Sequence, residues 1–299
     1  MTRKFLWGVI IILLLTNLLT VAVWMKDRSV NNLSFLNVDV KEDEPVATIG
    51  NSEISSEQWL ADLETNYGKQ SLKELINKNI VTKLAKDENL EVNSKIIERE
   101  ISLLLTMKGV LGKEEIERNI KKWTEDIRYR LYLEELFTRD IEIANSEIEE
   151  YYEHYKNQYQ FQESIQLSHI LVKDKETAEK LIRELENGES FESLAKEYSI
   201  DENTRLKGGY LGYFTEDSEL LPSEYYSKAS DMKELSYSDP FLSANGVAII
   251  YLHQLLPSVT FDFEELKSQI RRDLALDKLK SSVNADQLWD QFEVNWVYD

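Results

Sequence analysis

The sequence predicts an α+β protein in which a mostly helical module is interrupted by a compact domain of short strands and helices. Apolar residues recur at helical spacing through most of residues 45–162 and again after Pro257. Between these stretches, residues 163–256 combine short β-like runs with brief helical runs and glycine-rich turns. A twenty-residue apolar segment near the N-terminus adds a transmembrane helix to this prediction.

Composition and charge limit the classes of function that fit the chain. With 299 residues, 42% of them hydrophobic, the chain can bury one large core or two ordinary ones. The formal net charge of -20 argues against a nucleic-acid partner, because an acidic surface repels phosphate backbones. The absence of cysteine excludes disulfides, thiolate zinc sites, cysteine nucleophiles and lipid-bearing cysteines.

The predicted anchor lies in residues 5–24, "FLWGVIIILLLTNLLTVAVW", which contain no charged residue. An α-helix of this length can cross a bilayer, and Trp7 and Trp24 stand near its ends, where aromatic rings favour the interface. We therefore expect residues 1–24 to be an uncleaved, single-pass anchor in the cell membrane, with the folded part outside the cytoplasm. The alternatives are a cleaved signal peptide, whose apolar core is usually shorter, and a buried soluble helix. Residues 25–44 are predicted to form a polar tether.

The first part of the helical module, residues 45–162, opens with "VATIGNSEIS". Two short β-like runs flank Gly50-Asn51, a pair typical of a tight turn with positive φ. Ser55 and Gln58 fit a capping box at the start of the following helix. Apolar residues then continue at helical spacing: Leu72, Leu75, Ile76, Ile80 and Leu84.

The pattern changes in residues 163–256. "SIQLSHILV" reads as a buried strand, and "KETAEKLIRELEN" has helical spacing and ends at Gly188. Ser190 can cap the helix in "FESLAKEY", and the glycine-rich "KGGYLGYF" and the alternating "GVAIIYLHQ" follow. Helical spacing then returns, and the chain ends in the β-like "FEVNWVY". We expect residues 257–299 to complete the helical module, with a terminal strand that pairs with the "VATIG" hairpin.

Six short motifs in residues 163–256 carry a family resemblance: "LSHILV", "FESLAKEYSID", "KGGYLGYF", "LLP", "SDPF" and "NGVAIIYL". Their order and spacing resemble the parvulin family of peptidyl-prolyl cis-trans isomerases. The flanking "VATIGNSEIS" and helices resemble the chaperone module of the membrane-attached bacterial foldases of the PrsA and SurA type. The resemblance implies a parvulin domain, with a small antiparallel sheet and short helices, inserted into a helical chaperone-like module.

The reaction implied by this resemblance is rotation about an X-Pro bond. The amide loses its resonance as it twists, so the barrier is about 20 kcal/mol and spontaneous exchange takes tens of seconds or more. An enzyme needs an apolar seat for the proline ring and polar groups that favour the twisted amide. We therefore expect no cofactor and no metal. The expected partners are unfolded or partly folded exported polypeptides with X-Pro bonds.

The resemblance makes His169 and Asp201 the expected catalytic residues. His169 matches the first of two facing histidines in the family, and Ser168, beside it in the motif, is expected to contribute to substrate binding. Asp201 matches a position where parvulins carry a cysteine or an aspartate close to the substrate carbonyl. From the residues alone, His169 reads as a hydrogen-bonded core histidine and Asp201 as a turn residue. Both interpretations can hold together.

The expected proline seat departs from the family pattern, which commonly shows a methionine and, four residues on, a phenylalanine. Leu220 stands at the methionine place. An ungapped count puts Glu224 at the phenylalanine place, whereas one inserted residue puts Tyr225 there, and we expect Tyr225 to cover the proline ring. The remaining candidates for the seat, which are equally good as packing residues, are Phe214, Leu221 and Phe241.

A second departure concerns the other histidine of the family pair. Its place, two residues after the glycine of "NGVAIIYLHQ", is taken by Ala248. His253 lies five positions further along the same strand, so its side chain should point to the opposite face. Elsewhere, Glu150 and His154 stand four apart on a predicted helix, but no second histidine motif completes a metal shell.

Two functions are therefore predicted. The first is a membrane-anchored, extracytoplasmic peptidyl-prolyl isomerase and foldase that assists the folding of exported proteins. The alternative is a non-catalytic holdase chaperone with a degenerate parvulin domain, which Ala248 favours. The retained His169 and Asp201 and the glycine motif favour the isomerase.

Overall fold

The computed structural model describes residues 44–279 and 282–298. The predicted anchor in residues 5–24 and most of the predicted tether lie outside these residues. No helix in the part of the chain that the structure describes is both long enough and apolar enough to span a membrane.

The chain divides into two compact units. The first consists of Met1–Asn77 and Val294–Asp299, and the second of Lys78–Glu293. The described elements that begin in the first unit are β1 (Ala47–Ile49), β2 (Ser52–Ile54), α2 (Ser56–Leu63), a π-helical turn (Glu64–Gly68) and α3 (Lys69–Asp87).

The hairpin and the serine cap at the start of the first unit confirm the sequence prediction, whereas only the Ser55 half of the expected capping box is present among the described contacts. β1 pairs antiparallel with β2, and Gly50 in the turn between them has a φ of 59°. The side chain of Ser55 caps α2 by accepting a hydrogen bond from the backbone N–H of Gln58 (3.1 Å). The local turn and cap chemistry of this segment therefore determines its structure.

The predicted terminal strand is wrong. Residues 293–296 have no regular secondary structure, and β1 pairs only with β2 among the described residues. β1 is exposed along its whole length, so a third strand would gain little apolar burial there. The C-terminal segment still returns to this unit, because the Tyr298 hydroxyl donates to Glu64 Oε1 (2.6 Å). Gly68 allows this contact, since a Cβ at that position would overlap the Tyr298 hydroxyl.

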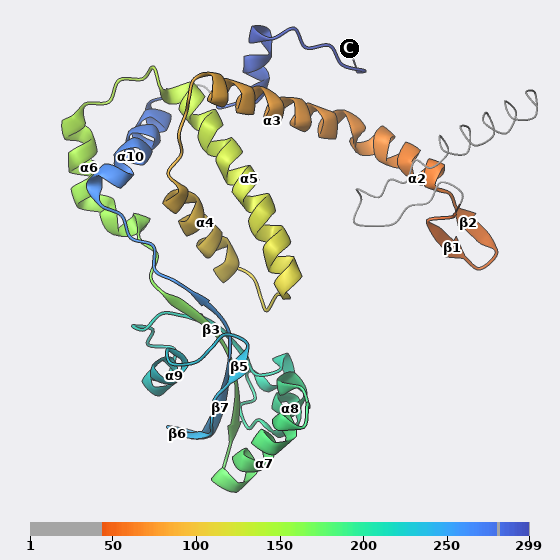
Figure 1. Cartoon of the computed structure of the whole chain (residues 1–299), viewed down its shortest axis with the longest axis vertical. Coiled ribbons are helices and arrows are strands. Elements are labelled where there is room, and N and C mark those ends of the chain that lie inside the picture. The colour runs from red at the N-terminus through yellow and green to blue at the C-terminus, as the bar shows by residue number, and fades with distance from the viewer. Residues whose placement is uncertain (1–43, 280–281, 299) are drawn as a thin grey trace, which may run out of the picture. The chain divides into compact units, whose positions relative to one another are not determined.

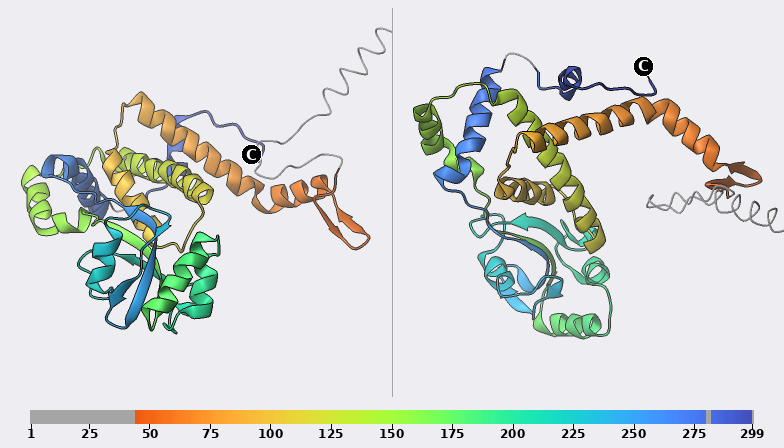
Figure 2. Two further views of the ribbon diagram at one scale, coloured as in Figure 1. Left: turned by 60° about the horizontal axis from the view of Figure 1, so that its bottom comes forward. Right: turned by 45° about the horizontal axis from the view of Figure 1, so that its top comes forward.

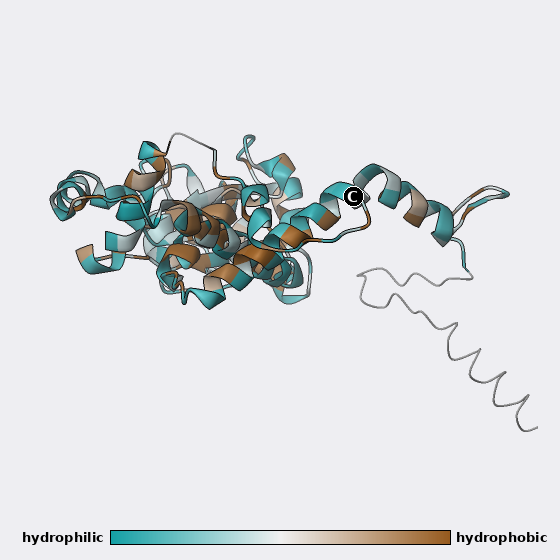
Figure 3. Cartoon of the chain, turned by 90° about the horizontal axis from the view of Figure 1, so that it is seen from above, coloured by the Kyte–Doolittle hydropathy of each residue, from teal (hydrophilic) through white to brown (hydrophobic). Residues whose placement is uncertain are grey.

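The second unit has a helical part with one apolar core. After the end of α3, its elements are α4 (Ser94–Thr106), α5 (Lys113–Thr138), α6 (Asn145–Tyr159), α10 (Phe263–Lys278) and a 3-10 helix (Ala285–Gln291). Helix α10 follows the sheet domain in sequence but packs against α5 and α6 (Figure 1). Hydrophobic and hydrophilic residues are interspersed along these helices, as amphipathic packing requires (Figure 3).

The core of this helical part draws on all of its long segments. Its fully buried members include Leu131, Leu266 and Ile270. Phe161, just before the sheet domain, and Val259, just after it, form an antiparallel bridge and belong to the same core. The helical part is therefore discontinuous in sequence, as predicted. The boundaries of the sheet domain, residues 163–256, stay a prediction.

An antiparallel sheet forms the rest of the second unit. Its strands are β3 (Ser164–Val172), β4 (Tyr210–Phe214), β5 (Ser236–Tyr237), β6 (Phe241–Ser243) and β7 (Gly246–Leu256), in the order β4-β3-β7-β5, with β6 also paired to β7. The helices of this domain are α7 (Lys175–Glu186), α8 (Phe191–Tyr198), a 3-10 turn (Arg205–Lys207) and α9 (Ser223–Ala229). His169 pairs with Ile250 at the centre of the sheet.

Each face of the sheet has its own cover. Helices α7 and α8 lie on one face and α9 on the other (Figures 1 and 2). Ile170, Val172 and Ile249 pack on the α7 and α8 side, whereas Leu167, Ala248 and Ile250 pack on the α9 side. Because side chains alternate along a strand, this division fixes which polar residues of β3 and β7 face which helix.

Candidate active site

His169 lies on the α9 side of β3, and the glycine motif holds its backbone in place. Its amide donates to the carbonyl of Gly209 (2.9 Å). Gly209 has a φ of 78°, and a Cβ there would overlap the His169 carbonyl oxygen. Glycine is thus required both for the turn and for the close approach of two backbones. The glycine-rich turn predicted from the sequence is confirmed at Gly209.

Asp201 is brought to His169 by the segment that follows α8. The amide of Ile200 donates to the carbonyl of Leu171 (2.8 Å), and the Ser199 hydroxyl accepts from the amide of Leu171 (3.2 Å). The carboxylate of Asp201 also accepts from the amide of Asn203 (3.1 Å). Asp201 is therefore a turn residue and a neighbour of His169 at once, so the two sequence interpretations hold together.

The imidazole of His169 is hydrogen-bonded at both nitrogens. Nε2 lies 2.8 Å from Asp201 Oδ2, and Nδ1 lies 2.9 Å from the Tyr225 hydroxyl. Thr204 Oγ1 donates to the same carboxylate oxygen (2.5 Å) and lies 3.1 Å from Nε2. Since a carboxylate can only accept, Nε2 carries the proton, and Nδ1 accepts from Tyr225.

The charge states of the three groups agree with this arrangement. Burial lowers the pKa of His169, although Asp201 opposes the shift, so the imidazole is neutral at pH 7. Burial acts to raise the pKa of Asp201, but hydrogen bonds from Thr204, His169 and Asn203 outweigh it and lower that pKa. Burial raises the pKa of Tyr225 to about 12, so its hydroxyl remains a donor. The result is a chain of hydrogen bonds from Tyr225 through His169 to an ionised Asp201.

A cavity of about 420 Å³ adjoins this chain of hydrogen bonds. Its apolar wall includes Leu221, which is buried, and Leu220, whose side chain is 88% exposed at the mouth. Ser243 and Asn245 supply polar groups on another side. The residues that line the cavity are His169, Leu171, Ile200, Asp201, Leu211, Leu220, Leu221, Pro222, Tyr225, Ser243 and Asn245. A volume of this order holds a proline ring and its neighbouring peptide groups.

The structure distinguishes the candidates for the proline seat. Tyr225, not Glu224, faces the cavity, and Glu224 instead accepts a hydrogen bond from Ser243 Oγ (2.9 Å). Phe241 packs edge to face on Tyr225, with ring centroids 5.4 Å apart. Phe214 packs on the apolar core beneath the site and does not line the cavity. Tyr225 itself is only 2% exposed, so most of its ring is buried behind the cavity surface and only a small part can contact a ligand.

Ser168 is not part of this site. It precedes His169 on β3, so its side chain points to the opposite face, where its hydroxyl bonds to His253 Nε2 (2.7 Å). The structure therefore places Ser168 outside the cavity beside His169, and a contribution of Ser168 to substrate binding stays a prediction. The prediction that His253 faces away from Ala248 is confirmed. Ala248 is fully buried, pairs with Leu171 and leaves no side chain to bond His169.

Sequence reasoning missed two partners of His169. Thr204 follows Asp201 by three residues, a spacing at which a hydroxyl can reach back to a carboxylate across a turn. The Tyr225 hydroxyl was also missed, because the residue was considered only for its ring. The replacement of phenylalanine by tyrosine at a seat position was the available signal, since a buried tyrosine hydroxyl needs a partner.

The predicted helix pair Glu150 and His154 has an ordinary local contact. His154 Nδ1 donates to the backbone carbonyl of Glu150 (2.8 Å). Across residues 44–279 and 282–298 there is no group of three or more His, Asp or Glu side chains that could hold a metal ion. The isomerase chemistry considered for this cavity uses neither a metal nor a cofactor.

Comparisons with known proteins agree with the geometry. The family described as the PPIC-type PPIase domain matches residues 143–268. The YacD protein of Bacillus subtilis (strain 168), which carries the name of a peptidyl-prolyl cis-trans isomerase, is 40% identical over 256 residues, 85% of this chain and 86% of YacD. The foldase protein PrsA of Geobacillus sp. (strain WCH70) is 28% identical over 239 residues, 80% of this chain and 81% of PrsA.

A crystal structure of PrsA from Bacillus anthracis, a peptidylprolyl isomerase, is also similar. It shares 24% sequence identity with a TM-score of 0.31, and the match covers 74% of this chain and 94% of that one. The relationship to YacD spans nearly the whole of both chains and confirms the family resemblance seen in the motifs. The chain therefore belongs to the parvulin, or PPIC-type, family of peptidyl-prolyl cis-trans isomerases.

Proposed function

We propose that this protein is a membrane-anchored foldase that isomerises X-Pro bonds in exported polypeptides outside the cytoplasm. The observation that supports the catalytic part is the neutral His169, held between Tyr225 and the ionised Asp201 at the wall of an apolar cavity. The uncharged segment at residues 5–24 supports the anchor. The similarity to PrsA foldases supports polypeptides as substrates.

In the proposed mechanism, the proline ring enters the cavity against Leu220, Leu221 and Pro222. Removal of water from the amide disfavours its planar form, whose resonance places negative charge on the carbonyl oxygen. The Asp201 carboxylate, held near that oxygen, disfavours the same charge further. Both effects raise the free energy of the planar amide relative to the twisted one, so the barrier to rotation falls.

His169 and Tyr225 act through Asp201 in this proposal. The Nε2–H of His169 fixes the orientation of the carboxylate, and the Tyr225 hydroxyl fixes the orientation and tautomer of the imidazole. In the family, a second histidine stands where this chain has Ala248. Tyr225 therefore supplies a hydrogen-bond partner for His169 from α9 in place of one from β7, which favours retained turnover.

The holdase remains the second candidate because Ala248 removes one polar group from the family's site. In that case the cavity would bind proline-containing segments without lowering the barrier. The protein would prevent aggregation through binding alone.

An exchange measurement separates the two candidates. We would measure cis-trans exchange in an Ala-Pro peptide by two-dimensional NMR, using residues 25–299 and the His169→Ala and Asp201→Ala variants. Catalysis predicts faster exchange with the wild-type chain and a loss of this effect in both variants. No acceleration by the wild-type chain, together with suppression of client aggregation, would support the holdase.

The location needs its own test. We would express the full chain and a variant without residues 1–24 in a bacterial cell, then separate membranes and add protease to intact protoplasts. The proposal predicts a membrane-bound chain whose folded part is degraded from outside. A soluble chain, or protection from the protease, would contradict it.

A further inference from the structure

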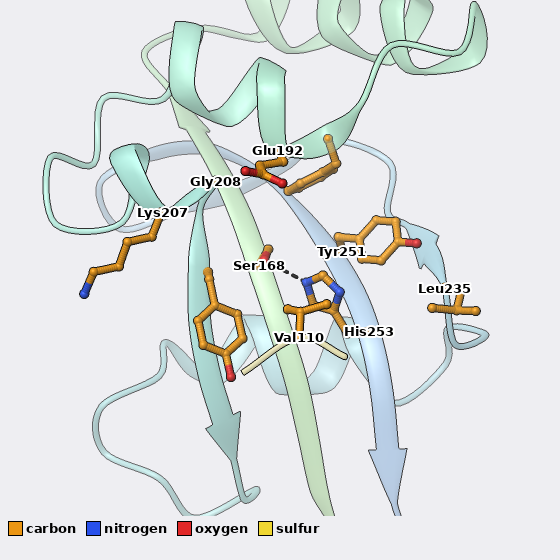
Figure 4. A pocket seen from close by; sticks show the side chains of 10 residues that line it. Val110, Ser168, Glu192, Lys207, Gly208, Leu235, Tyr251 and His253 are labelled. Carbon is orange, nitrogen blue, oxygen red and sulfur yellow. Dashed lines mark hydrogen bonds between the residues drawn. The ribbon is translucent and has the colours of Figure 1, made fainter. Parts of the chain in front are cut away.

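The sheet face opposite His169 carries a second cavity. Helices α7 and α8 cover one end of this face, and the cavity lies at the other end, beside Ser168, Tyr251 and His253. The cavity measures about 530 Å³. Figure 4 shows the side chains that line it. Its lining residues are Val110, Ser168, Phe191, Glu192, Lys207, Gly208, Tyr210, Leu235, Tyr251 and His253. None of these residues belongs to the isomerase cavity.

Four ring-bearing side chains form one wall of the cavity: Phe191, Tyr210, Tyr251 and His253. Tyr251 stands between Phe191 and His253, with ring centroids 5.4 Å and 4.7 Å away. The ring of Tyr210 meets His253 from β4, at 6.3 Å between centroids. These neighbouring rings offer a large contact area to an apolar side chain at low cost in conformational entropy.

The floor of the cavity is polar but uncharged. The Ser168 hydroxyl bonds to His253 Nε2 (2.7 Å), and burial lowers the pKa of His253 to about 4. Within the described ranges, His253 Nδ1 has no hydrogen-bond partner of its own. A neutral imidazole nitrogen beside apolar walls can bond one peptide group of a bound chain.

Leu235 at the mouth of the cavity has an unfavourable backbone conformation and an exposed apolar side chain. Its φ is 59°, its amide donates to the carbonyl of Leu252 (2.7 Å), and its side chain is 65% exposed. A leucine in the left-handed region costs about 1–2 kcal/mol, and its exposure adds an apolar surface to water. Val110, from the loop between α4 and α5, is a second exposed apolar residue at this cavity (51%). Strain that displays an apolar side chain is typical of a binding site.

Two residues with charged side chains line the cavity, Glu192 and Lys207. Glu192 forms an ion pair with Lys196, so its charge is compensated. Lys207, also in the lining, makes no ion pair with any residue that the structure describes. In Figure 4 the Lys207 side chain points away from Tyr251 and His253, so Lys207 can meet only an oxygen of a ligand segment that extends beyond the aromatic wall. A phosphate-bearing ligand would need further donors, which the aromatic wall does not supply.

We propose that this cavity is a second polypeptide-binding site, which takes a large apolar side chain of an extended, non-native segment and has no requirement for proline. The aromatic wall would hold the side chain, His253 a peptide group, and Lys207 an oxygen of the segment. Only the class of occupant rests on the proposed foldase function. The cavity, its neutral floor and its exposed leucine do not depend on catalysis at His169.

Two exposed leucines on opposite faces of the sheet provide a matched test. Leu235→Asn removes the apolar side chain at the second cavity, and asparagine tolerates the positive φ, so folding should be preserved. Leu220→Asn makes the same change at the isomerase cavity. The probe is a fluorescein-labelled, proline-free peptide rich in leucine and phenylalanine, and its affinity for residues 25–299 is read by fluorescence anisotropy.

We expect Leu235→Asn to weaken binding of this peptide roughly tenfold, from the loss of one buried leucine contact, and Leu220→Asn to leave it unchanged. Lys207→Glu should weaken binding of a peptide with an acidic flank more than that of a neutral one. Leu235→Gly should reproduce the loss seen with asparagine, since glycine also fits the backbone. Thermal unfolding of each variant should match or exceed that of the wild type.

Several results would overturn the proposal. Unchanged affinity in both Leu235 variants would show that the peptide does not use this cavity. Equal weakening by Leu220→Asn would show that one shared site binds all peptides. Wild-type self-association in ultracentrifugation that disappears in Leu235→Asn, without peptide binding, would assign the cavity to a second copy of the chain. If the wild type fails to accelerate X-Pro exchange while Leu235→Asn still weakens binding, the proposed isomerase function fails and this proposal stands.

Discussion

Tyr225→Phe tests whether a tyrosine hydroxyl has taken over the support of His169. The change removes one oxygen atom and keeps the ring, its edge-to-face contact with Phe241 and its burial. The bond that is lost is the 2.9 Å contact between the hydroxyl and Nδ1 of His169. The bond from Nε2 to Asp201 remains, so the imidazole keeps one of its two anchors.

The magnitude follows from the energy of one buried hydrogen bond. Such a bond contributes about 1 kcal/mol net, and an acceptor left without a partner costs about 1–3 kcal/mol. We expect the free energy of unfolding to fall by about 1–2 kcal/mol. If the same bond orients the imidazole during the reaction, kcat/KM should fall roughly fivefold, which corresponds to about 1 kcal/mol.

The pH dependence of kcat/KM distinguishes positioning from packing. The Tyr225 hydroxyl donates only to a neutral Nδ1, so its removal should make His169 easier to protonate and raise the pKa of His169. The acid limb of the kcat/KM profile should therefore move to higher pH. Tyr226→Phe is the matched control, because Tyr226 is also buried and its hydroxyl bonds to Glu163 (2.9 Å) away from His169. If Tyr225→Phe keeps the wild-type kcat/KM and acid limb, the supporting role is refuted.

Four further changes test other parts of the account. Asp201→Asn should lower kcat/KM at least roughly tenfold in the NMR exchange assay with little change in fold, since the charge is lost and the shape kept; wild-type activity would argue against its role. Ala248→His should lower the free energy of unfolding in urea by about 1–3 kcal/mol, because Ala248 is fully buried and leaves no room for an imidazole. A gain in activity without this loss of stability would contradict the view that Tyr225 replaces the missing histidine. Gly209→Ala should cost about 2 kcal/mol or more, from its positive φ and the overlap with the His169 carbonyl; normal stability would show that the backbones can separate. Burial holds the pKa of His253 at about 4, so between about pH 6.5 and pH 4 only the unfolded state takes up a proton on this residue. The free energy of unfolding should therefore be fully retained above about pH 6.5 and should fall as the pH falls towards 4. After allowance for solvent screening at this partly exposed ring, the loss is on the order of 1–2 kcal/mol, and His253→Gln should remove it.

Local chemistry was predictable from the sequence where a short motif determines it. The turn at Gly50, the cap at Ser55 and the cap at Ser190 formed as the residue types require. The approach of Asp201 to His169, 32 residues apart, followed from the family resemblance rather than from any local pattern. The membrane anchor at residues 1–24 itself stays a prediction.

The features that were not predicted correctly mostly depend on contacts between segments far apart in the sequence. The opposite orientation of Ser168 and His169, by contrast, is local, because successive side chains of a strand alternate between its two faces. The segment "FEVNWVY" has β-like residues, yet the three-residue β1 presents only exposed positions for it to pair with. The bond between Tyr225 and His169 depends on how α9 packs on the sheet, which no local pattern in the sequence encodes.

The central claim is that the cavity beside His169 lowers the barrier to X-Pro rotation through Asp201. The most direct measurement is the NMR exchange rate of an Ala-Pro peptide with residues 25–299 and with the Asp201→Asn variant, at equal peptide occupancy. The account predicts accelerated exchange with the wild-type chain and strongly reduced exchange with a variant that still binds the peptide. Equal exchange rates for the bound peptide in both proteins would contradict it.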